Sequence, residues 1–137
     1  MPTTLLHPPL IMGLTAGVLG LLYVLLSALV VSNRSKNKVL LGDGGDDGAP
    51  SLLTAIRTHA NFAEYVPFAL ILIGYQETVA GQTIMVKALC GALIVARVLH
   101  PMGMFAGGAN PMRAGGFVLT LTVIAVAAGG DILTILG

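Results

Sequence analysis

The sequence predicts an all-α membrane protein, a bundle of four transmembrane helices that forms a single domain over residues 1–137. Two features of the composition lead to this fold class. Hydrophobic residues make up 55% of the chain and charged residues only 9%, whereas about a quarter of the residues in a soluble domain are charged. The mean hydropathy is +0.91. In addition, the chain contains four long, largely apolar stretches, the first of which is long enough to cross ~30 Å of hydrocarbon.

The first predicted span covers residues 10–31, which include no charged residue. Pro8 and Pro9 precede it, and proline is well suited to the start of a helix. Gly13 and Gly17 give a GxxxG spacing, which predicts the close approach of another helix.

The polar segment 32–50 follows the first span and is predicted to lie outside the bilayer. It contains Arg34, Lys36 and Lys38 and then a stretch rich in glycine and aspartate, which favours turns. Three acids in this stretch raise the alternative of a calcium loop. Their spacing does not match the EF-hand pattern, and no bidentate glutamate follows. We therefore interpret the segment as a solvated loop.

The second predicted span, residues 52–77, carries a polar stripe. Arg57, Asn61 and Glu64 stand at positions i, i+4 and i+7 and therefore share one helix face. A carboxylate inside a bilayer costs several kcal/mol unless it has partners within a bundle. The stripe indicates either a functional site or an internal ion pair that only fixes helix packing.

Three further residues refine this second helix. Ser51 is predicted to cap its start. Pro67 removes one backbone hydrogen bond and predicts a kink beside the buried acid. His59 points about 200° away from the first arginine of the stripe, so we expect it to form a hydrogen bond at a helix interface instead.

The third predicted span covers residues 84–100. Arg97 and His100 lie three residues apart near its end and therefore share a face. Pro101 and Gly103 are predicted to end or kink the helix.

A second loop at residues 107–111 precedes the fourth predicted span, residues 114–136. Arg113 stands at the entrance of this span, where an arginine can anchor a helix at the membrane interface. Asp131 lies near the far end and is predicted to sit at the level of the head groups.

The distribution of basic residues predicts the orientation. Four spans place both termini on one side and both loops on the other. Six of the seven basic residues lie towards the loops: Arg34, Lys36, Lys38, Arg57, Arg97 and Arg113. By the positive-inside rule the loops are cytoplasmic and the termini are not. Since four of these arginines come from different spans, we expect them to gather at the mouth of a pocket floored by Asn61 and Glu64.

The composition argues against several classes of function. A net charge of +1 without a basic tract predicts no nucleic-acid binding. The single cysteine, Cys90, provides neither a disulfide framework nor a CxxC pair. No metal site is predicted, because the three histidines include no HxxxH pair.

A pocket with several guanidinium groups and one carboxylate suits a small ligand that carries carboxylates and an ammonium group. Glutathione is such a molecule. A nearby guanidinium lowers the pKa of its thiol and so raises the fraction of reactive thiolate. These residues alone do not select glutathione over another zwitterionic acid.

Longer patterns resemble a known family. Arg57-x-x-x-Asn61-x-x-Glu64-Tyr65-x-Pro67 resembles the second-helix motif of the MAPEG family, the membrane-associated proteins of eicosanoid and glutathione metabolism. Gly42-Asp-Gly-Gly and Ala96-Arg97-x-x-His100-x-x-Gly103 are similar to the pattern of its small bacterial members. The resemblance covers essentially the whole chain.

This resemblance implies a homotrimer in a bacterial inner membrane, with glutathione as cosubstrate between neighbouring subunits. It implies that the following residues bind glutathione: Arg34, Arg57, Asn61, Glu64, Tyr65, Arg97 and His100. Arg113 is the nearest counterpart of the arginine proposed to stabilise the thiolate, and it is our predicted catalytic residue. Met104 replaces a tyrosine found in some members, which weakens the case for leukotriene or prostaglandin synthesis.

The leading hypothesis is therefore a glutathione transferase or peroxidase-like enzyme that acts on a lipophilic second substrate, an apolar electrophile from the bilayer. The alternative is a non-catalytic trimeric membrane protein that uses the polar pocket for ligand sensing or assembly. A small transporter would need a polar path to the opposite face, where the sequence offers little beyond Gln76, Glu77 and Lys87.

Overall fold

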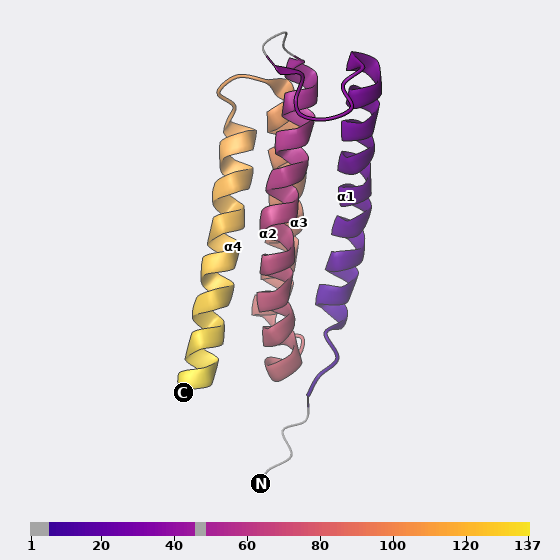
Figure 1. The fold of residues 1–137 in the computed structure, drawn as a ribbon. Coiled ribbons are helices and arrows are strands. Elements are labelled where there is room, and N and C mark those ends of the chain that lie inside the picture. Colours follow the sequence, from indigo (N-terminus) through magenta and orange to yellow (C-terminus); the bar gives the residue numbers. More distant parts are fainter. Residues whose placement is uncertain (1–5, 46–48) are drawn as a thin grey trace.

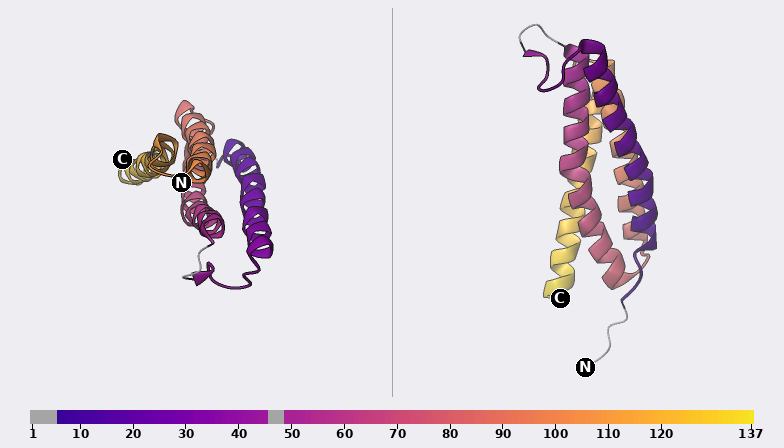
Figure 2. Two further views of the ribbon diagram at one scale, coloured as in Figure 1. Left: turned by 90° about the horizontal axis from the view of Figure 1, so that it is seen from above. Right: turned by 45° about the vertical axis from the view of Figure 1, so that its right-hand side comes forward.

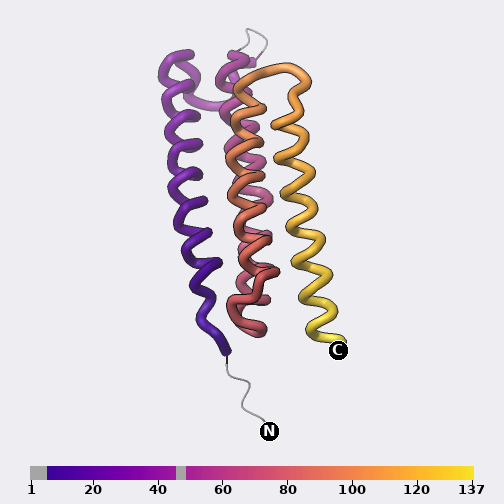
Figure 3. The backbone as a smooth tube through the Cα atoms, turned by 180° about the vertical axis from the view of Figure 1, so that it is seen from behind, coloured from indigo at the N-terminus to yellow at the C-terminus, as the bar shows by residue number. Residues whose placement is uncertain are grey.

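The computed structural model describes residues 6–45 and 49–137, which form four long helices that run alternately up and down (Figure 1). Their bounds are α1 (Leu10–Asn37), α2 (Pro50–Ala80), α3 (Ile84–Ala106) and α4 (Pro111–Leu136). The α1–α2 and α3–α4 connections lie at one end, here called the loop end (Figure 3). The start of α1 and the end of α4 define the opposite, terminal end. Asp46 and Asp47, two acids of the calcium-loop alternative, lie outside the described residues.

The helices α2 and α3 form the centre of the molecule, and α1 and α4 flank them on opposite sides (Figure 2). Within the described residues, α1 packs on α2 and α3, α4 packs on α3 and α2, and α1 and α4 do not contact each other. The apolar core lies between the four helices and includes Leu19, Phe62, Ile73, Leu93 and Val123. The right-hand view of Figure 2 shows a bend in α2, the helix that contains Pro67.

Three helices, α1, α3 and α4, are long and apolar enough to cross a membrane. The helix α2 does not meet the same criterion of length and composition, although it is the longest helix of the four. The prediction of four helices is confirmed, and three of the four predicted spans are confirmed as candidate membrane spans.

The helices extend beyond the predicted bounds. Of the two effects predicted for Pro101 and Gly103, an end of the third helix is wrong, because α3 continues to Ala106 and ends at Gly107, whose φ is 77°. A kink at these residues stays a prediction. A proline inside a helix removes one backbone hydrogen bond, which neighbouring turns can tolerate. The predicted cap at Ser51 is also wrong, since α2 begins at Pro50, with Ala49 as its N-cap.

Close helix contact occurs between α3 and α4 instead of at the predicted GxxxG pair of α1. A Cβ atom at Gly116 would lie 2.7 Å from the His100 nitrogen and 2.8 Å from the Ala96 oxygen, and one at Gly103 would overlap the backbone of α4. A Cβ atom at Gly13 or Gly17 would meet nothing within 4 Å. The predicted close approach at the α1 glycines is therefore wrong within one chain.

Polar side chains join α1 to α2 at both ends of the bundle. At the terminal end, the Glu77 carboxylate accepts hydrogen bonds from the backbone nitrogens of Ile11 at 2.8 Å and Met12 at 2.7 Å. These donors belong to the first turn of α1, which has no side-chain cap of its own. Nearer the loop end, His59 Nε2 and Ser27 Oγ lie 3.0 Å apart. This contact confirms the prediction that His59 forms a hydrogen bond at a helix interface.

Candidate functional site

A pocket of about 760 Å³ lies at the loop end, between α2, α3, α4 and the α3–α4 loop. Its wall combines polar and apolar side chains. The polar lining residues are Arg57, Asn61, Glu64, His100, Asn110 and Arg113. The apolar ones are Ala60, Met104, Ala109, Ala114 and Phe117.

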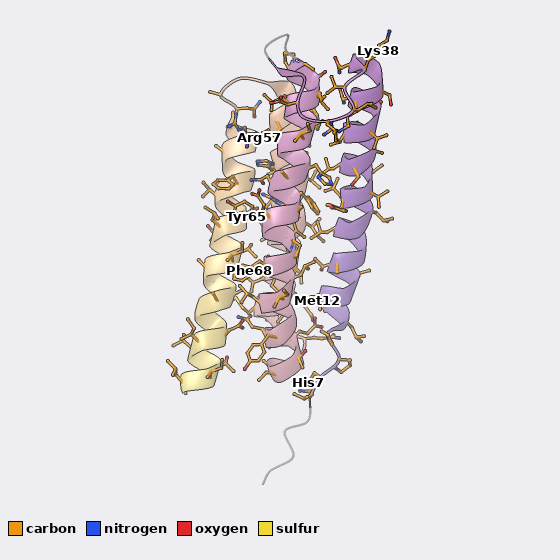
Figure 4. All side chains as sticks on the ribbon, viewed as in Figure 1. His7, Met12, Lys38, Arg57, Tyr65 and Phe68 are labelled. Atoms are coloured by element: carbon orange, nitrogen blue, oxygen red, sulfur yellow. The ribbon has the colours of Figure 1, made fainter. Side chains whose placement is uncertain are left out.

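The structure brings together five of the residues that the sequence singled out. Arg57, Asn61 and Glu64 line the pocket from successive turns of α2, so the predicted polar stripe forms one wall. Figure 4 shows Arg57 towards the loop end of this helix. Opposite them, His100 comes from α3 and Arg113 from the first turn of α4. Arg57, Glu64 and Arg113 are exposed and therefore accessible to a ligand.

Arg97 does not line this pocket but lies behind it. Its side chain is 1% exposed. Nη1 donates a hydrogen bond to Asn61 Oδ1 at 2.9 Å, and Nη2 donates to the Gly116 oxygen at 3.3 Å. Both acceptors are neutral, so these contacts leave the guanidinium charge without an acidic partner. The resemblance implied that Arg97 touches glutathione, whereas the structure places it one layer deeper.

Asn110 is a pocket residue that was not predicted from the sequence. It is the N-cap of α4, and its Oδ1 accepts a hydrogen bond from the Met112 nitrogen at 2.9 Å. An asparagine followed by proline at the start of a helix is a common capping signal, so Asn110-Pro111 could have identified this position. Because the oxygens of Asn61 and Asn110 both accept hydrogen bonds within the protein, their NH₂ groups remain as donors for a ligand.

Tyr65 also lies beside the pocket instead of in its wall. Its ring packs edge-on against Phe117, with centroids 5.5 Å apart. Phe117 lines the pocket, and so does Met104, the residue predicted to replace a tyrosine. The pocket therefore has an apolar side formed by α3 and α4.

Arg34 lies outside the pocket. Its Nη1 donates hydrogen bonds to the Leu40 oxygen at 3.3 Å and the Gly42 oxygen at 2.9 Å, both in the α1–α2 loop. The sequence predicted four arginines at one pocket mouth. Within one chain only Arg57 and Arg113 line it, because α1 does not contact α4 and Arg97 is buried.

Two other features of the described residues bear on the site. No group of three His, Cys, Asp or Glu residues in this part of the chain could hold a metal ion. A smaller, largely apolar cavity of about 280 Å³ lies between α1 and α2, on the side of α2 that carries Phe62, Val66 and Pro67.

Comparison with known proteins places the chain in a family. Residues 12–132 match the model of the MAPEG family. The inner membrane protein YecN of Escherichia coli strain K12 is 38% identical over 91 residues, which cover 60% of this chain and 66% of that protein. YecN of Escherichia coli O6:H1 strain CFT073 gives the same values. The match therefore spans slightly less than two thirds of each chain. No solved structure matches the chain. The protein is thus an integral membrane protein that belongs to the MAPEG family.

Proposed function

We propose that this protein is a glutathione-binding membrane enzyme, a glutathione transferase or peroxidase-like catalyst that acts on apolar electrophiles from the bilayer. The observation that carries the proposal is the polar lining of the pocket at the loop end. Among the described residues, it presents two arginines, two asparagine NH₂ groups and a single carboxylate, that of Glu64. Such a wall is complementary to a ligand with several acceptor groups and one cationic group.

Glutathione has this pattern of groups, with two carboxylates and one ammonium group. In the proposed complex, Arg57 and the NH₂ groups of Asn61 and Asn110 bind carboxylate or carbonyl oxygens, and Glu64 binds the ammonium group. Arg97 adds a positive charge directly behind Asn61. The cations near the pocket thus outnumber its acid, which favours a ligand with net negative charge. The MAPEG family includes glutathione transferases, and its members commonly bind glutathione.

Arg113 is the proposed catalytic residue. It is exposed at the pocket, in the first turn of α4, where the helix dipole also favours an anion. Its guanidinium would favour the thiolate over the thiol. In the transferase reaction, the thiolate sulfur attacks the electrophilic carbon and forms a C–S bond, and the leaving group departs with the electron pair of its bond.

The apolar side of the same pocket would hold the second substrate. Met104 and Phe117 provide contact area for a hydrocarbon group beside the polar wall. A hydroperoxide bound there would be reduced by two glutathione molecules: its O–O bond breaks, one oxygen stays in the alcohol, the other leaves as water, and the two thiols are oxidised to the disulfide.

The proposal includes a homotrimer in which α2 also crosses the bilayer. Arg57 and Glu64 are exposed on a helix that packs between three candidate membrane spans. Exposure of these charges to lipid would be costly, whereas a neighbouring subunit could cover them. Arg34 lies at the loop end, the same end as the pocket, so it remains a candidate ligand residue for the site of a neighbouring subunit. The basic residues at the loop end favour cytoplasmic loops, and the similarity to YecN favours a bacterial inner membrane.

Calorimetric titration of the purified protein with glutathione in nanodiscs tests binding. Arg57→Ala is expected to weaken binding about tenfold, because it removes a charge-assisted hydrogen bond. Lys36→Ala removes an exposed cation at the same end but outside the pocket lining, so it serves as the control. If Arg57→Ala and Lys36→Ala bound glutathione with equal affinity, this pocket would not be the glutathione site.

Turnover of a panel of electrophiles and hydroperoxides tests catalysis. Arg113→Ala is expected to lower the rate of glutathione conjugation or hydroperoxide reduction at saturating glutathione. Binding without turnover over the whole panel would favour the non-catalytic alternative, in which the pocket serves ligand sensing or assembly.

A further inference from the structure

We infer that Arg97 is a positioning residue: from behind the pocket its guanidinium fixes the Asn61 amide, so that Asn61 presents N–H donors to the ligand. This inference rests on the proposed function for the identity of the ligand, glutathione. It gives Arg97 a role other than direct contact with the tripeptide.

The contact between Arg97 and Asn61 determines how the amide is oriented. A guanidinium has donors and no acceptor, so it can bind the Oδ1 atom of the amide but not its NH₂ group. The distance of 2.9 Å from Nη1 to Oδ1 is that of a charge-assisted hydrogen bond. Since Asn61 also lines the pocket, its NH₂ group remains available there. The pair therefore selects an acceptor, such as a carboxylate oxygen, at this position of the ligand.

The burial of Arg97 excludes the simpler role of a ligand residue in this arrangement. The side chain is 1% exposed and is absent from the pocket lining, whereas Arg57 and Arg113 are exposed and belong to it. A ligand bound by Arg97 would have to reach this buried guanidinium, whose Nη1 and Nη2 atoms already donate to Asn61 and Gly116.

The second hydrogen bond of Arg97 connects this amide to the opposite wall. Nη2 donates to the Gly116 oxygen of α4, which also accepts a hydrogen bond from Thr120 Oγ1 at 2.8 Å. Gly116 lies in close contact with the backbone of His100, a pocket residue on α3. One buried guanidinium thus joins the α2 wall of the pocket to the α3–α4 pair.

Asn61→Asp separates the contact of this residue with Arg97 from its proposed contact with the ligand. The aspartate keeps an oxygen for Arg97 and adds a charge pair, but it offers acceptors to the ligand where the asparagine offered donors. We expect thermal stability to be retained and glutathione affinity to fall by about tenfold or more, because a carboxylate of the ligand would face another carboxylate. Wild-type affinity of Asn61→Asp would overturn the inference.

Arg97→Met tests the positioning effect against a matched structural control, Thr120→Val. Both remove a buried donor to the Gly116 oxygen, but only Arg97→Met also releases Asn61. We expect Arg97→Met to raise KM for glutathione about tenfold with a smaller change in kcat, and Thr120→Val to lower the melting temperature without a change in KM. Arg97→Lys keeps a cationic donor group, but without the planar fork of the guanidinium, and should recover part of the affinity. Equal KM values for Arg97→Met and Thr120→Val would refute a positioning role.

A measurement without ligand separates this inference from the proposed function. In ¹⁵N-asparagine-labelled protein, the side-chain signal of Asn61 is identified by its loss in Asn61→Asp. We expect it to shift in Arg97→Met and to stay in place in Thr120→Val. An unchanged signal in Arg97→Met would refute the contact even if glutathione binds. Conversely, a shifted signal in a protein that does not bind glutathione would refute only the proposed ligand.

Discussion

Glu64 and Glu77 lie on the same helix, but the protein uses their carboxylates differently. Glu64 is exposed and lines the large pocket at the loop end. Glu77 is 0% exposed, and both of its oxygens accept backbone hydrogen bonds from the start of α1. Gln76 beside it is similarly engaged, because its Nε2 donates to the Ala127 oxygen of α4 at 2.8 Å. The terminal end thus satisfies these polar groups internally, whereas the loop end leaves several accessible.

This difference separates two explanations for an acid in an apolar helix. A negative charge at the N-terminus of a helix is stabilised by unpaired N–H groups and by the helix dipole, so Glu77 has a structural explanation. Within the part of the chain that the structure describes, Glu64 caps no helix N-terminus and instead lines the pocket. An acid in an apolar helix therefore does not by itself indicate a binding site. Its surroundings distinguish a structural role, as at Glu77, from a binding role, as proposed for Glu64.

The largest effect on stability is expected for Glu77→Ala. The substitution leaves the backbone nitrogens of Ile11 and Met12 without their acceptor, at a cost of about 3 kcal/mol or more for two charge-assisted hydrogen bonds. Thermal unfolding in detergent should show a large drop in melting temperature. The fraction that remains folded should bind glutathione with wild-type affinity. A loss of affinity without a loss of stability would mean that the terminal end also serves the ligand.

The next effect concerns the packing that places Arg113 and His100 at the loop end. Gly116→Ala puts a Cβ atom 2.7 Å from the His100 nitrogen, which must push α3 and α4 apart and should cost about 2 kcal/mol. Gly115→Ala is the matched control, because a Cβ atom there meets nothing within 4 Å. Unfolding curves of the two variants should differ clearly. Similar curves would show that the close approach of α3 and α4 is dispensable.

Much of the fold follows from patterns that are local in the sequence. Apolar length predicted the four helices, and the spacing of Arg57, Asn61 and Glu64 predicted that they share one wall. A helical wheel also separated His59 from this stripe, and the contact with Ser27 agrees with that separation.

The rest depends on which helices meet, and local patterns do not contain that information. Arg97 and His100 share a face of α3. Their spacing does not reveal that Arg97 is buried against α2 and α4, whereas His100 lines the pocket. The capping role of Glu77 requires that the end of α2 meets the start of α1. Asp131, predicted at head-group level, is 8% exposed, and its Oδ1 has no hydrogen-bond partner among the described residues.

A smaller effect, on ligand affinity alone, is expected for Glu64→Gln. The variant keeps the shape of the side chain but loses the charge that would bind the ammonium group of glutathione. Affinity measured by titration should fall about tenfold, with little change in melting temperature, because the side chain is exposed. Destabilisation like that of Glu77→Ala would contradict the comparison, since both glutamates would then be structural.

The smallest effect is expected for Ser27→Ala, which tests whether every polar contact near the loop end belongs to the site. The substitution leaves His59 Nε2 without its partner at 3.0 Å, and one neutral hydrogen bond contributes about 1 kcal/mol to stability. The ring of His59 also stacks beside Tyr23, with centroids 4.7 Å apart, and this contact should keep it in place. We therefore expect a small decrease in melting temperature and unchanged glutathione affinity. If affinity falls instead, the α1–α2 interface is coupled to the pocket on the other side of α2, and the accessible polar groups of the loop end form one connected site.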